Sequence, residues 1–247
     1  MSGPGVLVDG AASGAGGGHP LDNPVWSALT GPHAPLATAH GRAAAYPPEI
    51  SPFVGLVDAR DPAAWADLAT LLAPGARGLL PSVDAVVPAG WEIARELGVQ
   101  LVDVSLAATE EPEAVPLGVD DVPDMLDLVA RTKPGPFLAR TVETGRYLGI
   151  RRGGRLVAMA GERMRLPGWT EISAVCTDPD HRGEGLATRL VRAVAAGIRS
   201  RAEVPFLHAA ANNTGAVRLY EHLGFQVRGT MTFHLVRRPD DGPAPSG

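Results

Sequence analysis

The sequence predicts a mixed α/β fold of the α+β type, and three observations support this prediction. Short apolar runs typical of strands alternate with amphipathic stretches typical of helices in both halves of the chain. Hydrophobic residues make up 45% of the 247 positions, so a sizeable core can form. The clearest helix follows a glycine-containing loop and carries one apolar stripe, which consists of Leu186, Leu190, Val191, Val194 and Ile198.

The first half of the chain, residues 21–105, is expected to form a small α/β unit. Helices are predicted after Asn23 and after Asp61, because each of these residues can cap a helix and precedes a proline. Strands are predicted at 52–57, 79–80 and 99–104. This half contains no recognisable catalytic motif.

The second half, residues 117–238, gives sharper signals for a larger domain. The expected elements are a helix after Pro123, strands at 147–150, 155–165 and 171–177, a helix at 185–199, a strand at 204–211, a helix at 214–223 and one or two strands within 225–237. The acidic, proline-bearing stretch 106–116 is the predicted linker. Residues 1–20 and 239–247 are predicted to be flexible tails, because they are too poor in apolar side chains to offset the entropy of ordering.

Charge and composition exclude several classes of function. The net charge is −5, from 22 basic and 27 acidic residues, so no nucleic acid or anionic membrane is expected as a partner. Cys176 is the only cysteine, which excludes a disulfide framework and a multi-cysteine metal site within one chain. The sequence has neither an apolar run of roughly 20 residues nor a secretory signal, so a reduced cytoplasmic protein is expected.

The loop between the strand at 171–177 and the helix at 185–199 is predicted to bind an anion. The first turn of that helix directs unpaired backbone N–H groups and the positive end of the helix dipole into the loop. Gly183 and Gly185 lack a Cβ, so a phosphate can approach the backbone closely, and Arg182 adds a positive charge. The loop lacks the Lys-Ser/Thr pair of a P-loop, and it does not fit the G-x-G-x-x-G pattern of a Rossmann site.

Two motifs resemble those of the GNAT superfamily of N-acetyltransferases. The run Arg-Gly-x-Gly-Leu-Ala at 182–187, which follows Val-x-Thr-Asp-Pro, resembles motif A, where family members grip the pyrophosphate of coenzyme A. The run from Asn212 to Phe225 resembles motif B, N-x-x-A-x-x-L-Y-E-x-L-G-F. The resemblance covers roughly residues 117–238, and its details, including the closing Phe-x-Leu-Val run, are similar to the glycine N-acyltransferase-like branch.

This resemblance implies a mostly antiparallel central sheet flanked by helices, preceded by a smaller and degenerate α/β half. It also implies acetyl-CoA as co-substrate, without a metal. The residues that the resemblance assigns to the cofactor are Val175, Cys176, Thr177, Arg182, Gly183, Glu184, Gly185, Leu186, Ala187, Thr188 and Asn213. Val175, Cys176 and Thr177 would pair with pantetheine through their backbone, and they also fit an ordinary core strand. Asn213 either contacts the cofactor or caps the helix that starts at Thr214.

Tyr220 and Glu171 are the predicted catalytic residues. In the family, the tyrosine of the L-Y-E run often protonates the departing CoA thiolate, although its place on a helix face also fits a core aromatic residue. Glu171 stands six residues before Thr177, about 20 Å along an extended chain, where some family members carry the base that deprotonates the amine. A solvated strand-end carboxylate is the alternative reading, and Glu162 or a water chain is a second candidate for the base.

The predicted activity is transfer of an acetyl group from acetyl-CoA to a primary amine by direct attack in a ternary complex. The acceptor is expected to be a small-molecule or peptide amine, selected by residues around 120–137 and 166–169. The competing readings are a non-catalytic acyl-CoA sensor and a separate partner-binding role for residues 21–105.

The histidines at 181, 208 and 222 are not spaced as metal ligands. Trp169 and Met164 either line the acceptor site or pack in the core. Oligomeric state and acyl length do not follow from the sequence.

Overall fold

An eight-stranded sheet forms the centre of the molecule in the computed structural model, which describes residues 18–240. Its strands lie in the order β4 (Arg77–Ser82), β11 (Phe225–Arg237), β5 (Glu92–Asp103), β10 (Val204–Ala210), β9 (Trp169–Thr177), β8 (Arg155–Leu166), β7 (Tyr147–Arg152) and β6 (Val115–Leu117). All neighbours are antiparallel except β9 and β10, which run parallel. The predicted mixed fold with a mostly antiparallel sheet is therefore confirmed.

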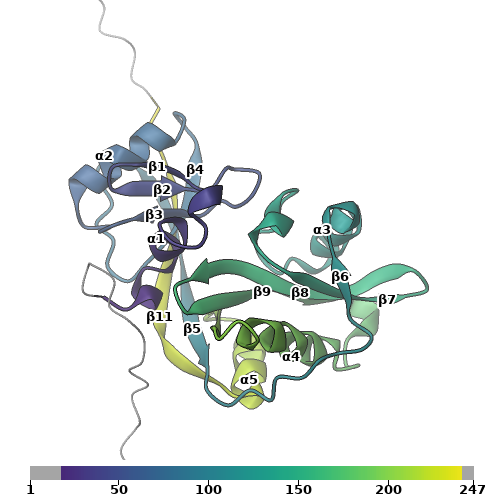
Figure 1. Cartoon of the computed structure of the whole chain (residues 1–247). Coiled ribbons are helices and arrows are strands. Elements are labelled where there is room, and N and C mark those ends of the chain that lie inside the picture. Colours follow the sequence, from purple (N-terminus) through teal and green to yellow (C-terminus); the bar gives the residue numbers. More distant parts are fainter. Residues whose placement is uncertain (1–17, 241–247) are drawn as a thin grey trace, which may run out of the picture.

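Helices cover both faces of this sheet (Figure 1). On one face lie α4 (Leu186–Arg199) and α5 (Thr214–Leu223), whose apolar stripes pack on the inward side chains of the central strands. The opposite face carries α3 (Val122–Thr132), which buries Met125 and Leu128 against β7 and β8, and the short helix α1 (Pro24–Leu29). The burial of these stripes removes apolar surface from water and fixes the helices on the sheet.

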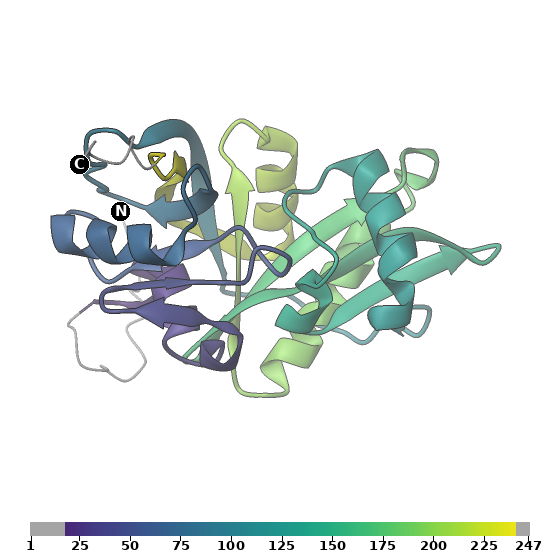
Figure 2. The same cartoon turned by 90° about the horizontal axis from the view of Figure 1, so that it is seen from above.

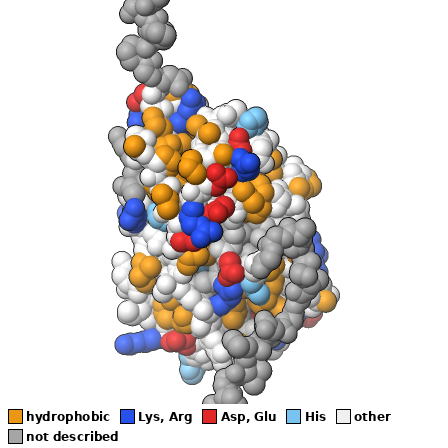
Figure 3. Space-filling view, turned by 90° about the vertical axis from the view of Figure 1, so that its left-hand side faces the viewer, with side chains coloured by type: hydrophobic (Ala, Val, Ile, Leu, Met, Phe, Trp, Pro, Cys, Tyr) orange, Lys and Arg blue, Asp and Glu red, His pale blue; other side chains and the backbone are white. Residues whose placement is uncertain are grey.

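A small N-terminal unit packs at the β4 end of the sheet. It consists of a three-stranded antiparallel sheet, β1 (Thr38–His40), β2 (Ala43–Ala45) and β3 (Val54–Leu56), together with α1 and α2 (Pro62–Leu71). Asp61 caps α2 by accepting a hydrogen bond from the backbone N–H of Ala63. Seen from above, this unit lies at one end of the molecule and α3 lies towards the other (Figure 2). Its outer face mixes apolar side chains with charges of both signs (Figure 3).

The large sheet contains strands from both sides of residues 106–116, which the sequence predicted to be a linker between two domains. Strands β4 and β5 precede this stretch, yet β5 lies between β10 and β11, which both follow it. The predicted strand at 99–104 in fact begins at Glu92, and 225–237 forms one long strand rather than two. The division at residues 105 and 117 is therefore not a division of the sheet, because the pairing of β5 depends on partners more than a hundred residues away.

Short 3-10 turns join these elements, at Pro20–Asp22, Ala34–Leu36, Val119–Asp121, Thr141–Thr144 and Pro179–His181. Of the predicted flexible tails, residues 1–17 and 241–247 lie outside the described residues, whereas His19 is described and caps the first of these turns. Within residues 18–240, no helix is both long and apolar enough to cross a membrane.

Candidate active site

The cleft that holds most of the predicted site residues arises where β9 and β10 separate. The two parallel strands pair over three residues each, Trp169–Glu171 with Val204–Phe206. Beyond this point β9 pairs with β8, and β10 pairs with β5. A cleft of about 1250 Å³ opens between them, lined by both strands and by the start of α4. The splayed strands leave backbone groups that a ligand can pair with, as an added strand would.

A bulge in β9 shapes the wall of this cleft. Met159 and Gly161 of β8 pair with Cys176 and Ser173, so β9 has one residue more than its partner between the two pairs. Ala174, within the bulge, adopts a left-handed conformation with φ of 53°, which costs a non-glycine residue about 1–2 kcal/mol. Such strain in a strand persists only where the surrounding structure imposes it. The predicted cofactor strand, Val175, Cys176 and Thr177, follows directly and lines the cleft.

The loop after β9 is anchored at its first residue. Asp178 is buried, accepts a hydrogen bond from the backbone N–H of Asp180, and forms an ion pair with Arg131 of α3. Its own N–H donates to the carbonyl of Val157 at 2.7 Å. The anchored loop then carries the chain to Gly183 and Gly185, which have φ of 85° and 74°. Only glycine adopts this left-handed region without strain, so the backbone conformation itself requires both glycines.

The amino end of α4 opens into the cleft at this loop. Gly185 is the N-cap residue, so no side chain satisfies the N–H groups of the first turn. A Cβ added at Gly183 or Gly185 would meet nothing within 4 Å, so the space beside both glycines is free for a ligand. The predicted residues Arg182, Gly183, Gly185, Leu186, Ala187 and Thr188 all line the cleft. This bare helix end with an adjacent guanidinium suits a diphosphate.

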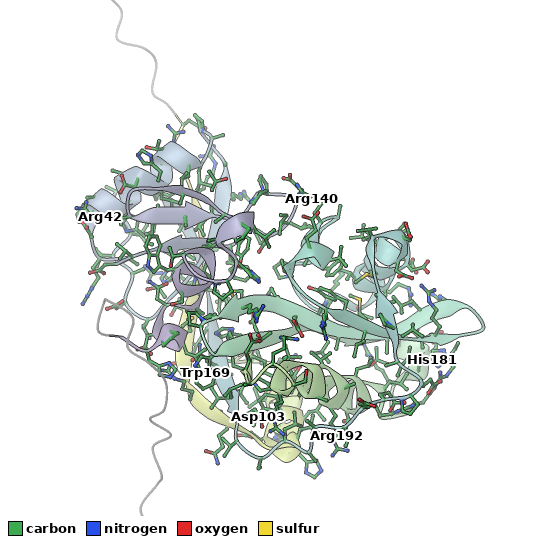
Figure 4. All side chains as sticks on the ribbon, viewed as in Figure 1. Arg42, Asp103, Arg140, Trp169, His181 and Arg192 are labelled. Carbon is green, nitrogen blue, oxygen red and sulfur yellow. The ribbon has the colours of Figure 1, made fainter. Side chains whose placement is uncertain are left out.

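Glu184 is the exception in this loop, because it does not line the cleft. Its carboxylate lies 2.9 Å from Nδ1 of His181, which lies far from Trp169 (Figure 4). The side chain of Glu184 therefore contacts another residue of the loop and does not face the cleft. Trp169 and Met164 do not line the cleft either; both pack in the core beside α1, and Trp169 contacts His19 edge to face.

Tyr220 lines the cleft from α5 and is buried, with 8% of its surface accessible to solvent. Burial, together with the nearby Cys176, raises the pKa of Tyr220 to about 12, so the phenol keeps its proton at neutral pH. Burial likewise raises the pKa of the Cys176 thiol to about 11, which disfavours the thiolate that a nucleophile would need. Asn213 caps α5 by accepting a hydrogen bond from the backbone N–H of Ala216, as one of its two readings predicted, and it also lines the cleft. Its contact with the cofactor stays a prediction.

Glu171 is fully buried and belongs to a network of three charged or polar side chains. Arg163 donates two hydrogen bonds to its carboxylate, at 2.8 and 2.6 Å, and Nδ1 of His208 lies 2.8 Å away. Burial alone would raise the pKa of Glu171, but the charge and hydrogen bonds of Arg163, with the bond from His208, hold this pKa at about 2. A carboxylate of this kind is a poor proton acceptor at neutral pH, so the geometry does not suit the predicted base. The solvated alternative does not apply either, because the side chain has no exposed surface.

Glu162, the second candidate for the base, lies elsewhere. It is buried, forms an ion pair with Arg201 at 3.0 Å, and lines a smaller hollow together with His33, Glu143 and Arg165. This hollow is separate from the cleft between β9 and β10. The structure therefore does not bring Glu162 to the reacting groups.

Several residues that line the cleft were missed by the sequence interpretation, because they come from the half without a motif. These residues are Phe53, Leu79, Glu96, Leu97 and Gly98, and they meet Phe233 and Leu235 of β11. Of the segments predicted to select the acceptor, residues 132–136 line the cleft and residues 166–169 do not. The sequence of Glu92–Asp103 could have indicated one long strand, but only residues 99–104 were predicted to form a strand.

Among the described residues, no group of three or more His, Cys, Asp or Glu side chains could hold a metal ion.

The fold and the cleft together define a class of protein. A sheet splayed at two parallel strands, with a bare helix amino end at the mouth of the opening, is suited to bind an extended cofactor that ends in a diphosphate. This arrangement supports an acyl-CoA-dependent acetyltransferase as the class of activity.

Comparisons with known proteins identify the family. The crystal structure of a protein assigned to the GNAT acetyltransferases, from Novosphingobium aromaticivorans, is 41% identical, with a TM-score of 0.82 over 91% of this chain and 100% of that one. The chain belongs to the GNAT family of acetyltransferases. The family model described as FR47-like protein matches residues 147–234. A GCN5-related N-acetyltransferase from Kribbella flavida, 18% identical, shares the fold with a TM-score of 0.56 over 84% of this chain and 90% of its own. No curated protein matches the chain.

Proposed function

We propose that this protein transfers an acetyl group from acetyl-CoA to a primary amine, by direct attack of the amine within a ternary complex. The observation that carries this proposal is the uncapped amino end of α4, which opens into the cleft beside two left-handed glycines. A diphosphate fits there because backbone N–H donors, the helix dipole and Arg182 act on one point. The cleft then continues between β9 and β10, along a strand that lacks a neighbour on one side.

In this proposal the backbone of Val175, Cys176 and Thr177 pairs with the pantetheine amides. A backbone N–H near Val175, beside the bulge at Ala174, stabilises the carbonyl oxygen of the thioester as it becomes negative. Tyr220 gives its proton to the sulfur as the carbon–sulfur bond breaks. Its position in the cleft and its raised pKa support this role, since the phenol stays protonated until the thiolate forms.

Glu171 has a different role in this proposal from the one predicted by the sequence. With a pKa of about 2 and no exposed surface, it acts as a positioning residue that holds Arg163 and His208, both of which line the cleft. His208 is also unsuited as a base. Its Nδ1 faces Glu171, and its Nε2 accepts a hydrogen bond from the amide of Gln100, whose Nε2 lies 3.1 Å away.

Titration calorimetry and an assay of thiol release test the proposal together. Acetyl-CoA is titrated into the purified full chain, and release of the CoA thiol is then followed with a panel of primary amines. We expect binding in the micromolar to millimolar range and thiol release that depends on the amine. Absence of acetyl-CoA binding in that range would exclude the proposal. Tight binding without turnover of any amine would instead favour a non-catalytic acyl-CoA sensor.

The finer placement of the chain also belongs to this proposal. We place it in the branch resembling glycine N-acyltransferases, on the basis of the run from Asn212 to Phe225 and the closing Phe-x-Leu-Val run. Its single cysteine supports a reduced, cytoplasmic setting. The acceptor is a small amine, and the N-terminal half acts as part of the acceptor site instead of as a separate partner-binding domain, since its residues line the same cleft.

A further inference from the structure

One region of the cleft lies on the sheet face opposite α4 and α5, and we name it the acceptor chamber. Its walls come from the five strands β4, β5, β8, β10 and β11 and from the segment before β3. It is lined by Phe53, Leu79, Glu96, Arg163, His208 and Phe233. Residues that pair directly across antiparallel strands share a sheet face. Because Phe233 pairs with Glu96, Leu235 with Leu79, and His208 with Gln100, these side chains converge on one face.

Two aromatic rings form a fixed apolar wall in the chamber. The rings of Phe53 and Phe233 meet edge to face with centroids 6.4 Å apart, and Phe233 meets His208 in the same way at 5.4 Å. Gly98 makes room for this arrangement, because a Cβ at position 98 would lie 2.5 Å from the ring of Phe233. Phe53 has only 1% of its surface exposed and supports the wall from behind, whereas the half-buried ring of Phe233 is held in place and can contact an apolar group.

One carboxylate in the chamber is available to a cationic ligand. The guanidinium of Arg163 lies 4.8 Å from the centre of the Phe53 ring, but the carboxylate of Glu171 already neutralises it. Glu96 is the only carboxylate among the described residues that line the cleft. Within the described part of the chain its carboxylate has no hydrogen bond or ion pair, and Glu96 stands directly opposite Phe233. A free carboxylate beside an aromatic ring suits an ammonium group.

A bridge of hydrogen bonds joins the N-terminal unit to the segment that follows α3. Arg140 donates from its backbone N–H to the carbonyl of Glu49 at 3.1 Å and from its guanidinium to the Glu49 carboxylate at 2.8 Å. Thr141 donates to the carbonyl of Ile50 at 2.6 Å. Arg140 therefore ties the N-terminal unit to the segment that follows α3 (Figure 4). The bridge residues do not line the cleft themselves, but they join the two segments that carry Phe53 and Pro136, which do line it.

We infer that the acceptor is a small primary amine joined by a short chain to an apolar group about the size of a phenyl ring. The apolar group packs on Phe233, whose ring Phe53 supports from behind, and the amine lies at Glu96. The inference rests on the proposed acetyl transfer. The ammonium group gives one proton to the Glu96 carboxylate, and the neutral nitrogen then forms the bond to the acetyl carbon. The nitrogen loses a second proton to solvent, the carbon–sulfur bond breaks, and the sulfur takes the proton of Tyr220. Glu96 then releases its proton to solvent, and Tyr220 takes one up from solvent.

Steady-state kinetics with the full chain and acetyl-CoA tests this inference. The acceptors are 2-phenylethylamine, glycine, spermidine and a short peptide with one lysine. We expect kcat/KM for 2-phenylethylamine to exceed that of each other amine at least tenfold. Phe233→Ala is expected to raise the KM for 2-phenylethylamine about tenfold and to leave the KM for acetyl-CoA unchanged. Phe233→Leu serves as a second variant with a milder effect, in case the alanine variant does not fold.

Glu96→Gln is expected to lower kcat about a hundredfold, and Glu96→Asp should restore part of the rate. Val83→Ala, an exposed apolar position outside the cleft, is the matched control and should change neither constant. Best turnover of glycine, spermidine or the peptide would overturn the inference, as would unchanged kinetics of both the Phe233 and Glu96 variants. If acetyl-CoA binds while these results fail, only the inference falls; if acetyl-CoA does not bind, the proposed function falls as well.

Discussion

The carboxylate of Glu171 accepts two hydrogen bonds from the guanidinium of Arg163, at 2.8 Å from Nε and 2.6 Å from Nη2. This pair is almost completely buried between β8 and β9, at the point where β9 begins to leave β10. His208 of β10 lies 2.8 Å from the same carboxylate. The three side chains thus join the strands on both sides of the opening, and they hold the end of the cleft in place.

Glu171→Gln should therefore destabilise the fold. The substitution leaves the Arg163 charge buried without its counter-charge, which typically costs about 3–5 kcal/mol. Chemical denaturation of both proteins measures the loss in the free energy of unfolding. Glu143→Gln is the control, because Glu143 pairs with Arg140 near the surface and such pairs contribute about 0–1 kcal/mol. Equal effects of the two substitutions would contradict the structural role of Glu171.

The same pair predicts how stability depends on acid. The pKa of Glu171 is about 2 in the folded chain, below its ordinary value of 4.5. A lowered folded-state pKa gives stability that is present above pH 4.5 and is lost as the pH falls towards 2. This shift corresponds to about 3 kcal/mol. The difference in unfolding free energy between the wild type and Glu171→Gln should shrink over this pH range, and a constant difference would argue against the ion pair.

Tyr220→Phe should lower kcat by about a hundredfold and leave the KM for acetyl-CoA nearly unchanged, because the hydroxyl acts on the leaving thiolate. Since the pKa of Tyr220 is about 12, the wild type should show no alkaline loss of rate from this group below pH 10. Tyr147→Phe is the matched control. Tyr147 is buried, its pKa is also raised to about 12 by burial, and it lies outside the cleft. Equal losses of kcat in both variants would remove the assigned role.

Gly185→Ala should weaken acetyl-CoA binding about tenfold, because an alanine resists the left-handed conformation that aims the first turn of α4 at the ligand. Gly153→Ala provides a control with comparable backbone strain. Gly153 has φ of 55°, has open space beside it, and lies in the β7–β8 hairpin away from the cleft. Calorimetric titration compares the two variants, and similar affinities would show that the turn at Gly185 is not part of the binding site.

A fragment of residues 110–247 should not fold. It lacks β5, the strand between β10 and β11, and it lacks β4, the other neighbour of β11. Long unpaired strand edges would remain, and the apolar face that carries Phe206 would lose its cover. Circular dichroism and thermal unfolding of the fragment test this prediction. A cooperative transition with full acetyl transfer would mean that the N-terminal half is dispensable.

Local patterns were enough to predict the cofactor end of the site. The glycines at 183 and 185, the apolar stripe of α4 and the capping residue Asn213 all act within a few residues of their own positions. The same reasoning located most helices, because caps and prolines mark their starts.

The acceptor end could not be predicted in this way. Glu171 finds Arg163 and His208 only through the strand register, and Glu96 meets Phe233 across a pairing that spans more than a hundred residues. No local signal records such partners. From the sequence, Glu171 was interpreted either as the base or as a solvated carboxylate at the end of a strand, whereas the folded chain buries it against an arginine.

The central claim is that the amino end of α4 binds a diphosphate. Calorimetric titration of the wild type with acetyl-CoA and with S-acetylpantetheine, which lacks the diphosphate and nucleotide, tests it most directly. The account predicts that acetyl-CoA binds at least a hundredfold more tightly, and that most of this difference disappears in Arg182→Glu combined with Gly185→Val. Equal affinities of the two thioesters for the wild type, or an undiminished difference in the double variant, would contradict it.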